Sequence, residues 1–197
     1  MINSSVVLEK IASSFEQMPY PGDLNIVYDN SGYHLECVDI QKIFANKHWN
    51  ELTLETLLAQ NSALAFMTPQ AYRFYLPAYL SIVIREFEEA EVLIDNTVFD
   101  LTLPVEADIL NKLNIIQNSN SPLSDGNQDM ISQILIDELS YSTQKVHRFI
   151  ERMSGFNQQQ GQAIRYFLEY LNFEKQDDFL NNEPRVAIER YWFIFPL

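Results

Sequence analysis

The chain is poor in the residues that most often build metal, disulfide and phosphate sites, with one cysteine, five glycines and three histidines. Cys37 alone cannot form an internal disulfide, so a reducing compartment fits best. No two glycines stand in a Gly-x-Gly sequence, which excludes the known phosphate-binding loops. One cysteine with His34, His48 and His147 cannot supply the usual ligands of a structural zinc site. We therefore expect neither a metal nor a cofactor.

Basic residues are also scarce, since 13 Lys and Arg against 27 Asp and Glu give a formal net charge of −14. Nucleic acid and anionic membranes repel such a surface, so we expect a partner of neither kind. The longest nearly apolar run, residues 74–84, is too short to span a bilayer. The N-terminus lacks the basic and long apolar regions of a signal peptide, which predicts a cytoplasmic protein.

Residues 64–87 form the most apolar and aromatic stretch of the chain, LAFMTPQAYRFYLPAYLSIVIREF. Thr68 is typical of a helix cap and Pro69 of the first helical position. Pro77 should then interrupt the helix, because an interior proline removes one hydrogen bond and clashes with the preceding turn, at about 3 kcal/mol. We therefore predict helices at 69–75 and 77–90, the second buried on several sides because it is apolar nearly all round.

Helical periodicity elsewhere predicts an all-α fold, with one domain over residues 1–197 and about seven or eight helices around this proline-punctuated pair. The other expected helices lie at 3–17, 33–45, after Thr53 as a cap, at 104–117, at 129–153, after Asn157 and after Pro184. In the helix after Asn157, this residue and Gln160 fit a capping box, and Arg165 and Glu169 stand four residues apart, where they can pair. Residues 91–104 contain β-branched residues and alternate loosely, so they are either a lone strand or, as we prefer, an extended coil. Residues 117–128 are polar with Pro122 and Gly126, which predicts a flexible loop.

Candidate binding or acid–base residues gather first in and after the 20–34 loop. Asp23, Asp29, His34 and Glu36 would converge if this loop folded back over the following helix. The alternative is that these polar residues merely turn the chain.

Arg73 is a second candidate, because it stands among aromatic residues that include Tyr75. An arginine in such surroundings either ties two helices together or grips a ligand, and the sequence does not decide between the two.

An acidic run occupies residues 86–108, where no Lys or Arg occurs between Arg85 and Lys112. Its acids are Glu86, Glu88, Glu89, Glu91, Asp95, Asp100, Glu106 and Asp108. The plain interpretation is a solvated face, and the alternative is a docking surface for a cationic partner.

Residues 66–80, FMTPQAYRFYLPAYL, resemble the signature F-x-T-P-E-A-x-R-Y-Y-L-P-A-Y of a family of small bacterial proteins of unknown function, with Gln70 in place of its Glu. The resemblance extends to YPGD at 20–23, KHWNEL at 47–52, QGQAIRYFLEYL at 160–171 and RYW at 190–192. It is weaker over residues 118–153. The family brings no catalytic assignment. Its members look similar to proteins encoded near bacterial toxins, which implies an immunity role.

Three functions remain open from these observations. The leading hypothesis is a non-enzymatic, immunity-like interaction protein that blocks a basic partner such as a toxin through acidic surface such as residues 86–108. The first alternative is an enzyme or small-ligand binder that uses the Asp23, Asp29, His34 and Glu36 cluster with Arg73. The second is a structural scaffold or homodimer with the C-terminal aromatic residues at its interface. The sequence leaves the oligomeric state open.

Overall fold

The computed structural model describes residues 3–118 and 125–197, and these contain α-helices, short 3-10 helices and no β-strand. Of the twelve α-helices in this part of the chain, nine have seven or more residues. The all-α prediction is therefore confirmed. The chain divides into two compact units, residues 1–102 with 152–197 and residues 103–151, which are described in turn.

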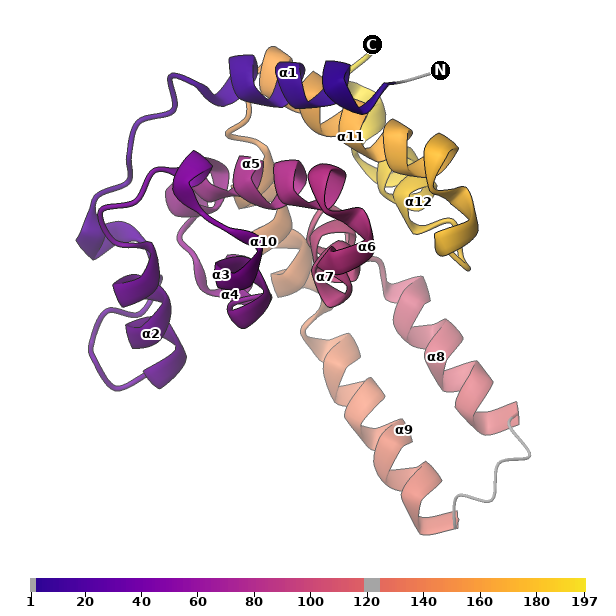
Figure 1. The fold of residues 1–197 in the computed structure, drawn as a ribbon. Coiled ribbons are helices and arrows are strands. Elements are labelled where there is room, and N and C mark those ends of the chain that lie inside the picture. Colours follow the sequence, from indigo (N-terminus) through magenta and orange to yellow (C-terminus); the bar gives the residue numbers. More distant parts are fainter. Residues whose placement is uncertain (1–2, 119–124) are drawn as a thin grey trace. The chain divides into compact units, whose positions relative to one another are not determined.

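The first unit holds most of the helices (Figure 1). Its α-helices are α1 (Ser4–Phe15), α2 (Leu35–Phe44), α3 (Leu54–Ala59), α4 (Ala63–Phe66), α5 (Pro69–Arg85), α6 (Phe87–Ala90), α7 (Val92–Asp100), α11 (Gln158–Glu174) and α12 (Glu183–Arg190). Its 3-10 helices are η1 (Asp23–Asn25), η2 (Trp49–Glu51), η3 (Gln176–Asp178) and η4 (Trp192–Ile194).

Helix α5 is the centre of this unit, as the apolar stretch predicts. The Thr68 hydroxyl accepts a hydrogen bond from the Ala71 N–H at 3.2 Å, and Pro69 takes the first helical position, so the predicted start is confirmed. Thirteen of its 17 residues are buried. Helices α1, α6 and α7 pack against it. A helix that is apolar nearly all round needs neighbours on several sides, and these three helices supply them.

The predicted break at Pro77 is wrong, because α5 runs through this residue to Arg85. Pro77 is buried together with every residue from 74 to 84. Burial of that many apolar side chains outweighs the cost of about 3 kcal/mol that an interior proline imposes. The predicted second helix also ends early, at Arg85, and the short helix α6 follows.

Residues 91–104, predicted as extended coil, instead form helix α7 over most of their length. Leu93, Thr97 and Val98 face inward from it, which is a helical spacing. The β-branched residues of this stretch favour an extended backbone and so pointed away from a helix. The Thr97 hydroxyl donates to the Leu93 carbonyl at 2.7 Å, which satisfies a buried polar group within the helix itself.

Helices α1 and α11 lie side by side above α5 in Figure 1 and contact each other along their length. Val7, Ile11 and Phe15 of α1 are fully buried between its neighbours. The capping box predicted at the start of α11 is confirmed, since Asn157 and Gln160 each bond to the other's backbone N–H.

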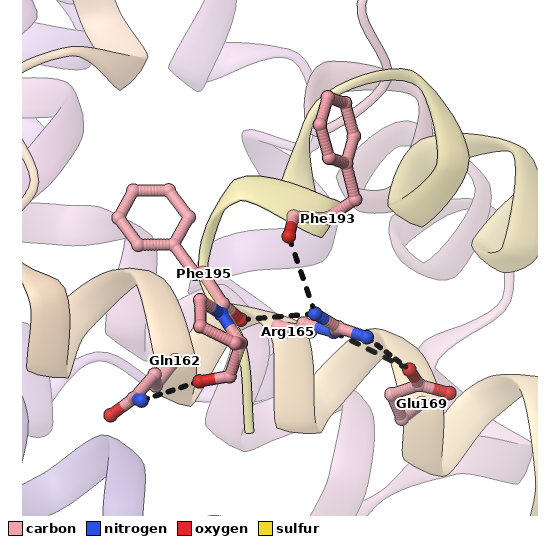
Figure 2. A network of polar contacts seen from close by, with 6 residues as sticks. Gln162, Arg165, Glu169, Phe193 and Phe195 are labelled. Carbon is pink, nitrogen blue, oxygen red and sulfur yellow. Dashed lines mark hydrogen bonds and ion pairs between the residues drawn. The ribbon is translucent and has the colours of Figure 1, made fainter.

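The C-terminal segment returns onto α11, which holds it by its backbone (Figure 2). Arg165 donates to the carbonyl oxygens of Phe193 at 3.5 Å and Phe195 at 3.2 Å, and it pairs with Glu169 at 3.4 Å, the spacing that the sequence predicts. Gln162 donates to the Pro196 carbonyl at 2.6 Å.

Replacing Gly161 by alanine tests this attachment. A Cβ at residue 161 would lie 2.2 Å from a ring carbon of Phe195, too close for any real contact. We expect the Phe195 ring to be displaced from α11 and the free energy of unfolding to fall by about 1–3 kcal/mol, measured by urea unfolding and by faster C-terminal proteolysis. Gln159→Ala, at an exposed position of the same helix, is the control and should change stability by less than about 0.5 kcal/mol.

The second unit consists of α8 (Glu106–Asn118), α9 (Asp125–Ser140) and most of α10 (Ser142–Met153). The single helix predicted at 129–153 is wrong, because α9 and α10 are separate around Tyr141. The Ser140 hydroxyl donates to the Asp137 carbonyl at 2.5 Å and competes with the helical bond there. Helices occupy both ends of the predicted flexible loop at 117–128, and residues 119–124 lie outside the described part.

Candidate functional site

Asp23 lies in a set of polar contacts that joins η1 to the end of α2. Its carboxylate accepts hydrogen bonds from the Tyr20 hydroxyl and from the Asn46 N–H, the second at 3.0 Å. The Gln41 side chain donates to the Asp23 carbonyl at 2.9 Å. Burial raises the pKa of Tyr20, and its hydrogen bond to Asp23 raises it further, so the hydroxyl stays a donor. This arrangement fixes the loop and occupies the carboxylate.

Tyr75 closes the same contact region from helix α5. It is fully buried, and its hydroxyl donates to the Phe44 carbonyl at 2.8 Å at the C-terminal end of α2. Burial raises the pKa of Tyr75. Its side chain therefore anchors α2 to α5.

His34 stands at the start of α2 beside two aromatic rings. Its ring lies 5.4 Å from that of Phe66 and 6.2 Å from that of Tyr28, and Tyr28 stacks on Phe66 at 6.1 Å. The Nδ1 atom of His34 is shielded from solvent and has no hydrogen-bond partner among the described residues.

Asp29 lies on the same loop, where hydrogen bonds from the side chain and backbone of Ser31 hold its pKa below the usual range. The nearby His34 contributes a smaller lowering of the same pKa. Glu36 is exposed in the first turn of α2. The structure thus brings Asp29 near His34 at the start of α2, while Asp23 is engaged at its other end.

Four large apolar side chains between residues 24 and 35 are open to solvent, and one of them, Tyr28, contacts His34. Tyr33 is 90% exposed, Leu24 76%, Leu35 75% and Tyr28 52%. We call these four residues, with Asp29 and Glu36, the Tyr33 surface. Sequence reasoning misses its apolar members, because Leu35 fits the apolar stripe of a helix, a pattern that predicts an inward-facing side chain.

Arg73 points to a different part of the first unit. Its guanidinium donates to the Arg152 carbonyl at 3.3 Å and lies over Gly155, where an added Cβ would be 2.4 Å from its Cζ. Burial lowers the pKa of Arg73. Among the described residues no ion pair joins it to Asp23, Asp29 or Glu36. This placement fits an Arg73 that ties helices together better than one that binds a ligand.

The acidic run places several carboxylates in solvent on α6 and α7. Glu88, Glu89, Glu91 and Asp95 are exposed and Glu86 is half-buried. We call these five residues the α6–α7 acidic surface. Lys175 approaches it from α11 and pairs with Glu88 at 2.9 Å. Glu106 and Asp108 belong to the second unit.

Asp100 is the member of the run that differs from the expected solvated acid. Burial raises its pKa to about 6, and the positive charge of Arg152 opposes this shift. The surrounding Tyr72 and Tyr79 are fully buried. Asp100 is therefore a titratable group that the charge pattern did not reveal.

Residues 8–118, more than half of the chain, match the model of a family described as a family of unknown function (DUF6714). The chain belongs to this family. No curated protein and no solved structure matches it. The prediction that the chain belongs to a family of unknown function is therefore confirmed.

The segment matched to DUF6714 contains the Tyr33 surface and the α6–α7 acidic surface, but not all of the residues that support them. Asp23, Asp29 and the α6–α7 acids lie inside residues 8–118, whereas Lys175, Arg152 and the C-terminal segment lie outside. Helix α11 buries α1 of the DUF6714 segment, so the two parts share one core.

Across residues 3–118 and 125–197, no three His, Cys, Asp or Glu side chains are grouped so that they could hold a metal ion. None of the described helices combines the length and hydrophobicity needed to cross a membrane.

Proposed function

We propose that the protein is a non-enzymatic interaction module that binds a basic protein partner through its acidic surface. The observation that carries this proposal is the α6–α7 acidic surface, where four carboxylates are exposed and the sequence supplies no base between Arg85 and Lys112. With a formal net charge of −14, the whole chain also attracts a cationic partner at long range.

The partner we propose more specifically is a basic bacterial toxin, which the protein would neutralise in the cytoplasm. The support is the resemblance of residues 66–80 to a family whose members look similar to proteins encoded near bacterial toxins, together with the acidic exterior. Blocking a toxin needs only a stable, complementary contact, and an exposed acidic surface supplies complementarity to Lys and Arg without any catalytic group.

The engagement of the other candidates favours interaction over catalysis. The Asp23 carboxylate accepts two hydrogen bonds within its own loop, and Arg73 is held against Gly155. A homodimer through the C-terminal aromatic residues could not use Trp192, which is fully buried in the first unit, and would have to rest on exposed side chains such as Phe193. A partner could reach Trp192 only after the C-terminal segment had unpacked.

Neutralising three acids of the α6–α7 surface tests the proposal. We expect the triple variant Glu89→Gln, Glu91→Gln and Asp95→Asn to bind a basic partner about tenfold more weakly at low salt, because it loses charge complementarity. The partner to use is the product of the gene immediately upstream. Titration calorimetry at several salt concentrations gives both the affinity and its salt dependence, which should become shallower.

A matched control removes the same charge elsewhere on the first unit. Glu9, Glu16 and Glu55 are exposed on and beside α1 and α3, and their change to glutamine should leave the affinity nearly unchanged. Equal weakening by both triple variants would mean that only net charge matters. An unchanged affinity in the α6–α7 variant would contradict the proposed surface.

A further inference from the structure

We propose that the Tyr33 surface is the contact that anchors the basic partner, by receiving apolar side chains that the partner presents between Lys and Arg residues. This inference rests on the proposed function and adds to it the place and the chemistry of the anchor. In this account the α6–α7 acidic surface attracts the partner, whereas the Tyr33 surface holds it.

Exposure of the four apolar side chains is the first argument. Leu24, Tyr28, Tyr33 and Leu35 all lie within one short segment of the chain, and each is more than half exposed. Concentrated apolar exposure on a water-soluble surface marks a contact site more often than scattered single residues do. Tyrosine is also among the residues that most often carry binding energy, since one end is apolar and the other hydrogen-bonds.

Hydrogen bonds hold the backbone that carries Leu24 and Tyr28, which is the second argument. The Tyr28 N–H donates to the Phe66 carbonyl at 3.1 Å, and the Thr68 N–H donates to the Ile26 carbonyl at 3.0 Å. The Asn30 side chain donates to the Leu24 carbonyl at 2.8 Å and closes the loop. A partner would therefore meet a preorganised surface and would lose less free energy in ordering it.

Charge is the third argument, and it indicates that the partner bound at the Tyr33 surface is basic. No Lys or Arg occurs between Lys10 and Lys42, while Asp29, Glu36 and Asp39 flank the apolar side chains. Arginine and lysine from a partner could pair with these carboxylates and lie over the exposed tyrosine rings. A second copy of this chain would bring the same negative surface against itself, and a nucleic acid or anionic membrane would be repelled.

A pair of synthetic peptides tests the inference without the natural partner. One peptide repeats the unit Arg-Leu-Lys-Leu and the other repeats Arg-Ser-Lys-Ser, so they share charge and differ in apolar anchors. At about 150 mM salt, where distant charges are screened, we expect the leucine peptide to bind at least tenfold more tightly by fluorescence anisotropy. The double variant Tyr33→Ala with Leu35→Ala should remove that advantage.

Two further variants separate the roles of the surfaces. Asp29→Asn with Glu36→Gln should weaken the leucine peptide and make its binding less sensitive to salt. The triple variant of the α6–α7 acids should leave the preference for leucine over serine unchanged. Because Tyr33 and Leu35 are strongly exposed, circular dichroism and thermal unfolding of their double variant should match the unaltered protein.

The inference is overturned if both peptides bind equally, or if the Tyr33 and Leu35 double variant keeps the preference for leucine. If the upstream product binds with strong salt dependence but is insensitive to Tyr33 and Leu35, this inference fails and the proposed function stands. If that product does not bind at all while the peptides behave as expected, the proposed function fails and the Tyr33 surface remains a site for basic apolar peptides.

Discussion

Replacing Trp192 by alanine is expected to lower the free energy of unfolding by about 3–5 kcal/mol, a large fraction of the stability of an ordinary domain. Trp192 is 0% exposed, and its indole N–H donates to the Leu101 carbonyl at 2.7 Å. The variant would leave a cavity beside Phe156 and Phe195 and an unsatisfied buried carbonyl at the end of α7. Urea unfolding followed by circular dichroism measures the change.

The neighbouring Phe193 provides the control for this variant. It is 58% exposed, so Phe193→Ala should cost less than about 1 kcal/mol although it removes an aromatic ring from the same segment. Similar losses for the two variants would show that the C-terminal segment does not complete the core of the first unit.

Replacing Asp100 by asparagine is expected to stabilise the protein above pH 6. Burial raises the folded-state pKa of this carboxyl to about 6, whereas the ordinary value is 3.8. Above pH 6 the folded protein therefore holds an ionised group in an unfavourable place, and the gap between the two values corresponds to about 3 kcal/mol at most. Asparagine has a similar shape without the charge and removes this penalty.

The sign of the effect follows from proton binding. Between pH 4 and pH 6 the folded state binds more protons at Asp100 than the unfolded state does, so the penalty grows as pH rises through this range. Below about pH 4 both states are protonated and the gain from Asp100→Asn should vanish.

Urea unfolding of the two proteins at pH 4 and pH 8 checks this prediction. Asp95→Asn, an exposed acid on the same helix, is the control and should change stability by less than about 0.5 kcal/mol at either pH. A destabilised Asp100→Asn variant at pH 8 would mean that the attraction of Arg152 outweighs the burial of the carboxylate.

Local signals were read correctly where a side chain and its backbone partner lie within one turn. The caps at Thr53, Thr68 and Asn157 stand where the sequence places them, as does the Arg165–Glu169 pair. These contacts depend on a few neighbouring residues, so a single sequence contains all the information that they need.

Features that depend on tertiary packing were missed. Pro77 would break an isolated helix, but α5 continues through it because burial of its side chains against neighbouring helices stabilises the helical conformation. Residues 92–100 have β-branched side chains that weaken helix propensity, yet packing of Leu93 and Val98 keeps them helical. The break at Tyr141 lies between two stretches that both have helical periodicity.

The candidate site was predictable in composition but not in arrangement. The sequence indicated an acidic run at residues 86–108 and a loop cluster of acids with His34, and the structure exposes carboxylates in both. That Asp23 faces Tyr20 and Asn46, that Leu35 faces solvent, and that burial raises the pKa of Asp100 all depend on how the loop and α7 fold onto α5. Periodicity alone does not decide which face of a short helix lies outside.

The central claim is that the acidic exterior exists for contact with a basic protein, and the salt dependence of binding tests it most directly. The affinity for the upstream gene product should be measured from about 50 to 300 mM salt, a range over which the screening length shortens markedly. We predict that the product is basic and that its affinity falls by at least about tenfold across this range. An affinity that does not change with salt, or no binding at low salt, would contradict the claim.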